Sequence, residues 1–375
     1  MATVKDVAKR ANVSTATVSR IINGQSNVAA ESRARVVAAI QELNYRPSRV
    51  ARRLRTNSTY VIALIISDIQ NFFYTSLTRG VEDVALQHGY SVILCNTEED
   101  PRRERQYLEV MYEENVAGII LASAISGDYD PQLPNGHIPM VALDRVVSAR
   151  ELDTVLADNI EGAKTAVTHL LSLGHSRVGA IIGAQGITSS LERQAGYEQA
   201  LTDFGLPVDP ELIRKVDLRQ AEDSRHQMLE LLALPNRPTA VFTGNALITL
   251  AALAAVHEAG LRIPEDIALV SFDDVPWGQL LNPPLTAVSQ PTYQLGKMAA
   301  EMLVARIANP SGPTTTVRLP LTLVVRESCG ARRHSEERPK RTRASARPST
   351  SPTKKLVKRN TKTQQVDGRR RPVKS

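Results

Sequence analysis

The fold of the amino-terminal segment is decided by the stretch TVKDVAKRANVSTATVSRIIN, residues 3–23. Thr3 and Asp6 have the spacing of a capping box, which predicts a first helix beginning just after Thr3. The apolar residues of that helix recur at intervals of three and four and would form one buried face; they are Val4, Val7, Ala8 and Ala11. Asn12 tolerates the positive φ that a tight turn needs, and Ser14 can cap a second helix.

Two short helices joined by a tight turn are typical of a helix-turn-helix, whose second helix enters the major groove of DNA. Val18 and Ile22 would pack on the first helix, which leaves the start of the second helix facing the bases. Arginine bonds bidentately to a guanine edge, whereas alanine and threonine offer apolar contact to a thymine methyl. We predict that this segment contacts DNA through Thr15, Ala16, Thr17, Arg20 and Asn23. The alternative is a small helical bundle without a nucleic-acid partner.

A third helix is expected to follow, with Val36, Ile40 and Leu43 turned inward. The sequence does not define its start sharply, because Ala29 and Ala30 stand where a capping Ser or Asp is usual. The three helices together would form a small all-α domain.

The next segment, NYRPSRVARRLR at residues 44–55, combines arginines with a short apolar strip. Pro47 suits the first turn of a helix, but an apolar strip of one turn cannot hold an isolated helix in water. We therefore expect a hinge helix over residues 47–55 only against a partner. Minor-groove binding proteins insert apolar wedges between base steps. The predicted DNA contacts of this segment are Tyr45, Arg49, Val50, Ala51 and Leu54.

Charge divides the chain into three blocks. Residues 1–58 carry 11 Lys/Arg and 3 Asp/Glu, residues 59–330 carry 19 and 33, and residues 331–375 carry 16 and 3. Two basic blocks flanking an acidic body indicate a polyanionic partner held by the ends. The last block has no aromatic residue and is rich in Ser, Thr and Pro, so we predict a disordered basic tail. Both extra phosphate contacts and an inert extension remain open as its role.

From residue 60 onward, short apolar runs alternate with helical stretches. The expected strands are Val61–Ile66, Val92–Cys95, Ala117–Ala122, Pro139–Leu143, Val178–Ile182, Ala240–Thr243 and Ile267–Phe272. The expected helices are 75–88, 101–114, 190–204 and 245–259. This alternation predicts parallel sheets of the doubly wound α/β type. We expect a two-lobed sensor body over 59–330, after a helix-turn-helix domain over 1–58 and before the tail over 331–375.

Composition and motifs exclude several other classes. The chain has 375 residues, too many for one ordinary core, and its apolar runs are too short to span a membrane. The amino terminus has no apolar secretion segment, and two cysteines, Cys95 and Cys329, cannot form a disulfide framework. No phosphate-binding loop, dinucleotide fingerprint, zinc-protease motif or C-x-x-C pair occurs, so we expect no cofactor, no metal site and no catalysis.

Residues 1–330 resemble the LacI/GalR family of transcriptional regulators. The motifs that carry the resemblance are VKDVAKRANVSTATVSRIIN, LNYRPSRVARRL, SDIQNFFYTSLTRGVEDVA, VALDR, LERQAGYEQAL, RIPEDIALVSFDD and PPLTAVSQP. The resemblance implies a homodimer, paired half-sites in an imperfectly palindromic operator, and a small-molecule effector. It also implies that Leu54 wedges into the minor groove, and that the body is similar to periplasmic ribose-type sugar-binding proteins, with the ligand between two lobes.

The candidate ligand residues lie near the carboxyl ends of the expected strands, where open α/β sheets bind ligands. They are Asp68, Phe73, Tyr74, Asp144, Arg145, Arg193, Asn245, Asp273 and Gln290, and the resemblance implies all of them except Asp68 for a ribose-type site. Carboxylates, amides and guanidiniums bond to sugar hydroxyls, and aromatic faces pack on sugar C–H groups. Taken singly, each polar residue has the alternative of a helix cap or a surface pair.

Some positions depart from the family pattern that the resemblance implies. Phe72 stands where a proline is usual, Ala246 where an aspartate is usual, and Leu218 and Arg145 where purine sensors carry aromatic residues. These departures favour a small polyol, sugar or sugar acid over a purine. Arg145 and Arg193 can serve a carboxylate or a phosphate as well as hydroxyls.

The sequence thus predicts a cytoplasmic, homodimeric DNA-binding transcriptional repressor whose operator affinity is switched by a small sugar or sugar acid. The alternatives are a periplasmic-type solute-binding protein, which would have no use for residues 1–58, and a purine-responsive regulator. A sugar-modifying α/β enzyme is a further rival, but it would need an acid/base pair or a phosphate loop.

Overall fold

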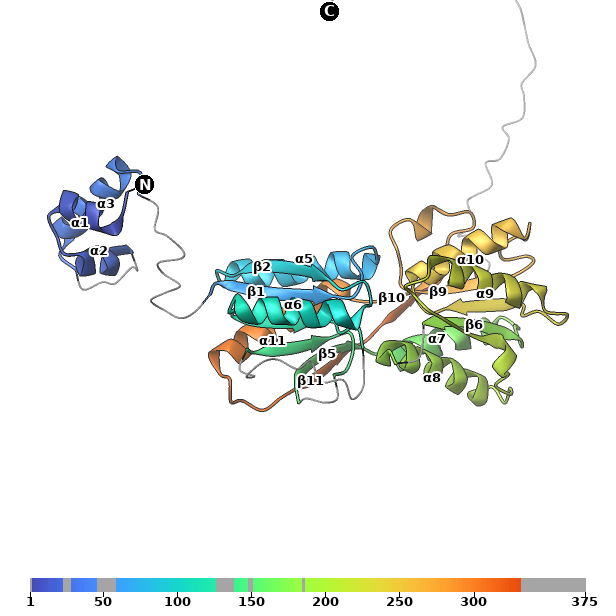
Figure 1. Ribbon diagram of the computed structural model, residues 1–375. Helices are drawn as coiled ribbons and strands as arrows, with labels where there is room; N and C mark the ends of the chain where they lie inside the picture. Colours follow the sequence, from blue (N-terminus) through green and yellow to red (C-terminus); the bar gives the residue numbers. More distant parts are fainter. Residues whose placement is uncertain are drawn as a thin grey trace, which may run out of the picture. The chain divides into compact units, whose positions relative to one another are not determined.

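The computed structural model describes residues 2–22, 28–45, 59–125, 138–147, 151–183 and 186–331 (Figure 1). The predicted hinge helix over 47–55 and the basic tail beyond Ala331 lie outside the described residues. No helix of the described part is long and apolar enough to cross a membrane.

The amino-terminal part consists of helices α1 (Val4–Ala11), α2 (Thr15–Ile22) and α3 (Ala30–Glu42). The predicted capping box is present at α1, since the Asp6 amide donates to Thr3 Oγ1 and the Thr3 amide donates to Asp6 Oδ2 at 2.7 Å. The Thr3 hydroxyl also donates to Asp6 Oδ2 at 2.7 Å, and the two hydrogen bonds that Thr3 donates lower the pKa of Asp6 below its usual range. Asn12 has a φ of 51°, as expected for the turn.

One apolar cluster holds the three helices together. Val7, Val18 and Val36, one from each helix, are fully buried at its centre. Ile21 of α2 is buried and Ile22 is only partly buried, so the inward face of α2 is turned slightly from the predicted one. The first helical residue of α3 is Ala30, and its cap position has no side-chain hydrogen bond, in line with the weak start signal.

The body contains two lobes, each built on a six-stranded sheet. The first sheet has the order β11-β5-β4-β3-β1-β2 and the second has the order β12-β10-β9-β8-β6-β7. Every pairing is parallel except that of β12 with β10. The predicted doubly wound α/β fold is confirmed.

The elements of the first lobe are β1 (Val61–Ile66), α5 (Phe72–Gln87), β2 (Ser91–Asn96), α6 (Pro101–Glu113), β3 (Gly118–Leu121), β4 (Met140–Leu143), β5 (Asp153–Ala157), α11 (Thr292–Ala308) and β11 (Thr316–Leu319). Those of the second lobe are α7 (Asn159–Ser172), β6 (Val178–Gly183), α8 (Thr188–Asp203), η1 (Pro210–Leu212), β7 (Ile213–Val216), α9 (Ala221–Ala233), β8 (Ala240–Thr243), α10 (Ala246–Glu258), β9 (Ala268–Phe272), η2 (Gly278–Leu280), β10 (Thr286–Ser289) and β12 (Thr322–Val324).

The chain crosses between the lobes three times. The crossings are at residue 158 between β5 and α7, at residues 290–291 between β10 and α11, and at residues 320–321 between β11 and β12. Three connections of at most two residues restrict how the lobes move, and they favour a hinge motion about the crossings.

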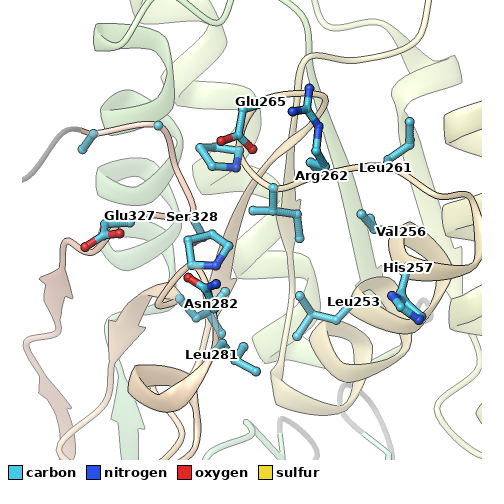
Figure 2. A pocket seen from close by; sticks show the side chains of 16 residues that line it. Leu253, Val256, His257, Leu261, Arg262, Glu265, Leu281, Asn282, Glu327 and Ser328 are labelled. Carbon is cyan, nitrogen blue, oxygen red and sulfur yellow. The ribbon is translucent and has the colours of Figure 1, made fainter.

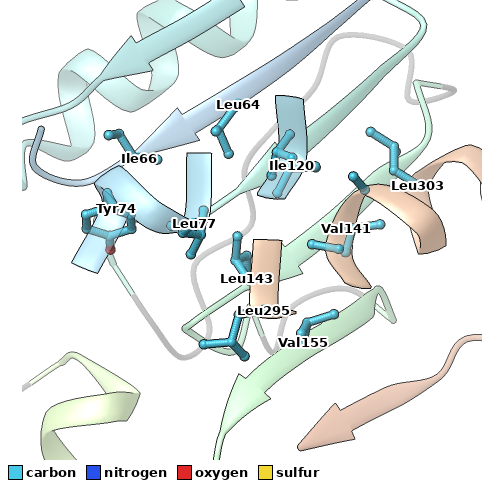
Figure 3. Close-up of a cluster of buried hydrophobic side chains, with 14 of the residues drawn as sticks. Leu64, Ile66, Tyr74, Leu77, Ile120, Val141, Leu143, Val155, Leu295 and Leu303 are labelled. Carbon is cyan, nitrogen blue, oxygen red and sulfur yellow. The ribbon is translucent and has the colours of Figure 1, made fainter. Parts of the chain in front are cut away.

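The core of the first lobe lies between its sheet and the two helices α5 and α11. Figure 3 shows side chains of both helices and of the strands pointing toward one another. Leu64, Leu77 and Leu303 are fully buried there. A fully buried side chain of this size contributes about 1.5–3 kcal/mol relative to its exposed state, so this packing fixes where the first turn of α5 lies.

Helices α5 and α11 approach each other through glycines. A Cβ on Gly80 of α5 would lie 2.2 Å from the Tyr293 carbonyl oxygen, and a Cβ on Gly296 of α11 would lie 2.0 Å from the Leu77 carbonyl oxygen. Each helix therefore presses its backbone against a position without a side chain on the other.

Candidate functional site

The exposed face of α2 carries residues that were predicted to contact DNA. Thr15, Ala16 and Arg20 are exposed, whereas Val18 and Ile21 on the opposite face are buried. An exposed first turn with a basic residue one turn later is the geometry that a recognition helix presents to the major groove.

Two other predicted DNA contacts have structural roles as well. The Thr17 amide donates to Ser14 Oγ at 3.1 Å, and the two hydroxyls are 2.9 Å apart, so Thr17 helps to close the turn before α2. Tyr45 is partly buried against the three-helix cluster. The remaining predictions, Asn23, Arg49, Val50, Ala51 and Leu54, fall outside the described residues.

The polar candidates of the body gather in the expected way. The six that are at most 9% exposed are Asp144, Arg145, Arg193, Asn245, Asp273 and Gln290. All but Arg193 lie within two residues after the end of a strand, and Arg193 lies on α8. They come from both lobes and from one of the crossings, where Gln290 sits.

Asp144 shows that the two lobes face each other at this point. Burial raises its pKa, while Arg145 and then Arg193 oppose that rise and Asp273 adds to it. Arg193 and Asp273 belong to the second lobe, so charges of both lobes act on one carboxylate of the first.

Asp144 and Asp273 occupy equivalent positions in the two lobes. Their φ angles are 66° and 83°, in the left-handed region. Each backbone amide bonds to the neighbouring strand, that of Asp144 to the Val155 carbonyl at 2.9 Å and that of Asp273 to the Val288 carbonyl at 3.0 Å. Strained non-glycine backbone of this kind persists where the surrounding structure imposes it, and it is concentrated at functional sites.

Arg145 is held by an acidic partner that the sequence analysis did not single out. Its Nη1 and Nη2 both donate to the Glu99 carboxylate at 2.6 Å, a bidentate pair. Nη1 also donates to the Ser123 carbonyl at 2.7 Å, and Nη2 donates to Ser67 Oγ at 3.3 Å. The opposed carboxylate keeps the pKa of Arg145 above its usual value despite burial.

Arg193 is held from three sides within the second lobe. Its Nε donates to Asn159 Oδ1 at 2.9 Å and its Nη1 donates to the Gly244 carbonyl at 2.6 Å. The guanidinium lies 3.9 Å from the centre of the Phe272 ring, a cation–π contact. These contacts fix a guanidinium whose charge also acts on Asp144.

Asp273 connects the cluster to the crossing. Its Oδ1 accepts from Gln290 Nε2 at 2.6 Å, and its Oδ2 accepts from the Ala246 amide at 3.2 Å. Asn245 caps α10, since its Oδ1 accepts from the Ile248 amide at 2.8 Å. The helix-cap alternative therefore describes Asn245 at least in part.

The aromatic candidates differ from one another. Phe73 is in edge contact with Tyr74, with ring centres 5.0 Å apart. The Tyr74 hydroxyl is 2.8 Å from Ser67 Oγ and donates to Asp144 Oδ2 at 3.5 Å, and its ring belongs to the core of the first lobe. Burial raises the pKa of Tyr74 far above its usual value. Tyr74 thus supports Asp144, whereas Phe73 lines a hollow.

Two hollows border the cluster. One of about 420 Å³ is lined by Phe73, Asp273 and Gln290 together with neighbouring residues of α5 and of the loop after β9. Another of about 620 Å³ is lined by Asp68 and the start of α6 from the first lobe and by residues 217–220 from the second. Asp68 is half buried, which raises its pKa.

Two buried polar atoms of the cluster have no hydrogen-bond partner among the described residues: Arg145 Nε, a donor, and Gln290 Oε1, an acceptor. Arg145 Nε is 3.6 Å from Asp144 Oδ2, beyond hydrogen-bond range. Leaving a buried polar group unpaired costs about 1–3 kcal/mol, so an unpaired donor and acceptor in one cluster indicate a place for a ligand that carries both functions.

Comparisons with known proteins bear on both parts of the chain. The family model described as bacterial regulatory proteins, lacI family, matches residues 3–48, and that of the periplasmic binding protein-like domain matches residues 167–329. The chain is 37% identical to the ribose operon repressor of Halalkalibacterium halodurans over 338 residues, which are 90% of this chain and 99% of that protein. It is 35% identical to the repressor PurR of Aliivibrio fischeri, over 88% of this chain and 99% of that protein.

Solved structures agree with this result. The lac repressor dimer bound to operator and the anti-inducer ONPF is 27% identical, with a TM-score of 0.76 over 88% of this chain and 99% of that chain. A LacI family transcriptional regulator from Enterococcus faecium with bound ribose is 29% identical, with a TM-score of 0.63 over 72% of this chain and 98% of that chain.

The chain belongs to the LacI family of bacterial regulatory proteins. The predicted family and the predicted DNA-binding regulator with a small-molecule effector domain are confirmed.

In this LacI-family regulator, the sequence analysis missed three residues of the cluster: Glu99, Ser67 and Phe272. Glu99 follows β2 by three residues at the same sheet edge as the other candidates, and this position was the available signal. Ser67 follows β1 directly, and Phe272 ends β9.

A larger hollow of about 1130 Å³ lies elsewhere in the second lobe, beside α10 and the last described residues (Figure 2). Its lining includes Leu253, His257, Arg262, Leu281 and Glu327, and none of the predicted effector residues. Within the described ranges, no three His, Cys, Asp or Glu side chains gather in a way that could hold a metal ion.

Proposed function

We propose that the effector of this regulator is a small sugar, bound by the cluster of Asp144, Arg145, Arg193, Asp273 and Gln290. The observation that carries the proposal is the unpaired buried pair, Arg145 Nε and Gln290 Oε1. A sugar hydroxyl is both donor and acceptor, so the hydroxyls of one sugar supply the acceptor and the donor that these two atoms lack. The proposed site is completed by Asp68, Phe73, Tyr74 and Asn245. Of these, Tyr74 and Asn245 support the structure around the ligand.

A sugar fits this site better than a purine. A purine base requires flat apolar faces on both sides. At position 145 this chain instead has a guanidinium group, and both terminal nitrogens of that group are bonded to the Glu99 carboxylate. Leu218 lines the hollow at the start of α6, where an aromatic face would be needed for stacking. The ribose named with the Enterococcus faecium structure and the ribose operon named with the Halalkalibacterium halodurans relative both support a pentose.

The test is calorimetric titration of the full chain with D-ribose, other pentoses, hexoses, hypoxanthine and guanine. We expect a pentose or similar neutral sugar to bind and the purine bases to show no heat. Binding of hypoxanthine or guanine with no response to any sugar would show that the purine alternative is correct.

We propose domain boundaries at residues 58 and 330, with a repressor mechanism that links the two ends of the body. Effector binding would close the lobes about the crossings at 158, 290–291 and 320–321. In a homodimer, this closure would shift the first lobe of one protomer against the first lobe of its partner and so alter operator binding. Effector binding would then change the affinity for the operator, and operator binding would change the affinity for the effector by the same factor. Gln290 sits in one crossing and contacts Asp273, which supports its part in this coupling.

We propose a homodimer that binds an imperfect palindrome in duplex DNA. The edge strand β2 exposes Ile93 and Leu94, each 39% exposed, and Leu250 and Leu280 of the second lobe are 55% and 80% exposed. Exposed edge strands and large apolar side chains are sites of association, and two-fold symmetry is the common solution. The relative of known structure named above is a lac repressor dimer. We propose further that the protein is not an enzyme and acts in the cytoplasm.

Replacing Arg20 with alanine is expected to lower operator affinity by about 10- to 100-fold, because one bidentate base contact is worth about 1–3 kcal/mol. Sugar affinity should not change. The measurement is fluorescence anisotropy at fixed salt, with a palindromic fragment selected from random DNA by the wild-type protein. Arg35→Ala is the matched control, since it removes the same charge from the exposed surface of α3. Full operator affinity in the Arg20 variant would contradict the role.

Replacing Asp144 with asparagine is expected to stabilise the free protein and to weaken sugar binding. Burial raises the pKa of Asp144 in the folded protein. Between the pKa of the unfolded chain and that of the folded protein, the folded protein therefore holds a proton that the unfolded chain releases, and wild-type stability falls as the pH rises through this interval. Asparagine removes that cost and tolerates a φ of 66°. We expect a Tm higher by about 2–4 °C per kcal/mol gained.

The pH dependence tests the cause. Over a range of pH values, the Tm advantage of Asp144→Asn should be largest at the alkaline end and should shrink toward the acidic end, as the wild-type carboxyl becomes protonated. Thermal unfolding across this range measures it. A Tm difference that is independent of pH would show that the ionised carboxylate is not the source.

A further inference from the structure

The proposed sugar site has a charge arrangement that decides which class of sugar it accepts. Three carboxylates and two guanidiniums meet in the cluster, those of Glu99, Asp144, Asp273, Arg145 and Arg193. With all five ionised, the cluster has a surplus of negative charge.

Arg145 does not offer two free parallel N–H donors to a ligand. Both of its terminal nitrogens are bonded to the Glu99 carboxylate, with the Ser123 carbonyl and Ser67 Oγ as further acceptors. Only Nε lacks a hydrogen-bond partner among the described residues. A single N–H binds one hydroxyl oxygen well, but bidentate recognition of a carboxylate or phosphate needs two parallel donors.

Arg193 is likewise partly engaged, through the Gly244 carbonyl, Asn159 Oδ1 and the Phe272 ring. Its charge acts on Asp144 across the lobes. An anionic group placed beside Arg193 would therefore also lie near Asp144 and Asp273, whose repulsion opposes the attraction.

The approach to the cluster adds to this selection. The hollow of about 620 Å³ is lined by five acidic residues and three arginines. The arginines are paired with acids of the same rim: Arg103 with Glu98 at 2.7 Å, Arg102 with Asp100 at 3.2 Å and Arg219 with Asp217 at 2.7 Å. Asp68 remains in addition, so this rim too has an acidic surplus.

We propose that this site selects neutral sugars and rejects the corresponding sugar acids and sugar phosphates, with Glu99 as the residue that sets the selection by occupying Arg145. The inference rests on the proposed sugar function and narrows it to uncharged polyols. Glu99 acts through Arg145 and is a specificity residue of the effector site.

The experiment is calorimetric titration of the full chain with matched ligands: D-ribose, D-ribonate and D-ribose 5-phosphate, together with D-glucose and D-glucose 6-phosphate. We expect the neutral member of the set that binds to have an affinity at least about 100-fold higher than its charged counterparts. A charged member that binds as well as its neutral partner, or better, would overturn the inference and leave the sugar function intact. Absence of binding by every member would overturn the sugar function itself.

The variant Glu99→Gln frees the donors of Arg145 and removes one negative charge. We expect the affinity ratio of D-ribose 5-phosphate to D-ribose to rise by at least about tenfold. Glu98→Gln is the matched control, because it removes the same charge one residue away, where Glu98 is exposed and pairs with Arg103. An unchanged ratio in a Glu99→Gln protein whose thermal unfolding remains cooperative, or an equal rise in both variants, would contradict the assignment of selection to Glu99.

Discussion

Replacing Asp273 with alanine is expected to lower effector affinity by about 100-fold or more while operator affinity without effector stays at the wild-type value. The carboxylate accepts hydrogen bonds from Gln290 Nε2 and from the Ala246 amide, and it borders the hollow that Phe73 lines. Removing it frees Gln290 from its position and takes away a ligand acceptor. One hydrogen bond from the sugar to this charged acceptor is worth about 1.5–3 kcal/mol, and the upper end of that range corresponds to about 100-fold in affinity.

The backbone at Asp273 requires a second variant. Its φ of 83° strains alanine, so Asp273→Ala alone mixes loss of the carboxylate with a change of backbone. Asp273→Gly removes the same carboxylate and accepts the angle without strain. Sugar titration and operator anisotropy on both variants separate the causes. If the glycine variant binds sugar with wild-type affinity, the carboxylate has no part in the site.

Periodicity predicted the strands and the amino-terminal helices well, because each depends on local pattern. The strands Val61–Ile66 and Ala240–Thr243 have the predicted bounds. The helix expected at 75–88 begins earlier, at Phe72, because Asn71 caps it and its Oδ1 accepts from the Phe73 amide at 3.0 Å. This cap places Phe73 and Tyr74 on the first turn of a helix rather than in a loop.

Other elements could not be found from local pattern. Helix α11 follows β10 of the second lobe and yet packs on α5 of the first, and only the sheet topology shows this crossing. Apolar and polar residues alternate only weakly along the strand β7, which carries Arg214 and Lys215, so this strand was not expected. Long-range pairing decides such elements, and the sequence holds no local sign of it.

The same limit applies to the site. Strand ends predicted which polar residues converge, but they did not show which partner each has. From the sequence, Arg145 was available to bind an anionic ligand. In the structure, both of its terminal nitrogens donate to the carboxylate of Glu99, 46 residues away. Electrostatic pairing at this sequence separation depends on how two loops meet, and that geometry fixes the ligand class more than the residue type does.

Replacing Gly296 with alanine is expected to destabilise the protein by about 3 kcal/mol, which corresponds to a fall in Tm of about 6–12 °C. In an isolated helix the change would be favourable by about 1 kcal/mol. Here the new Cβ would lie 2.0 Å from the Leu77 carbonyl oxygen. Backbone atoms cannot move away by rotation of a side chain, so α5 and α11 must separate.

This separation would also reach the proposed effector site. Phe73 is on the first turn of α5 and Gln290 lies two residues before α11, so displacement of these helices moves two sides of the same hollow. We expect sugar affinity to fall together with Tm. Gln294→Ala is the matched control on the same helix, since Gln294 is exposed, and it should leave both quantities near the wild-type values. A Gly296→Ala protein with wild-type Tm and sugar affinity would show that the close contact of α5 and α11 does not position the site.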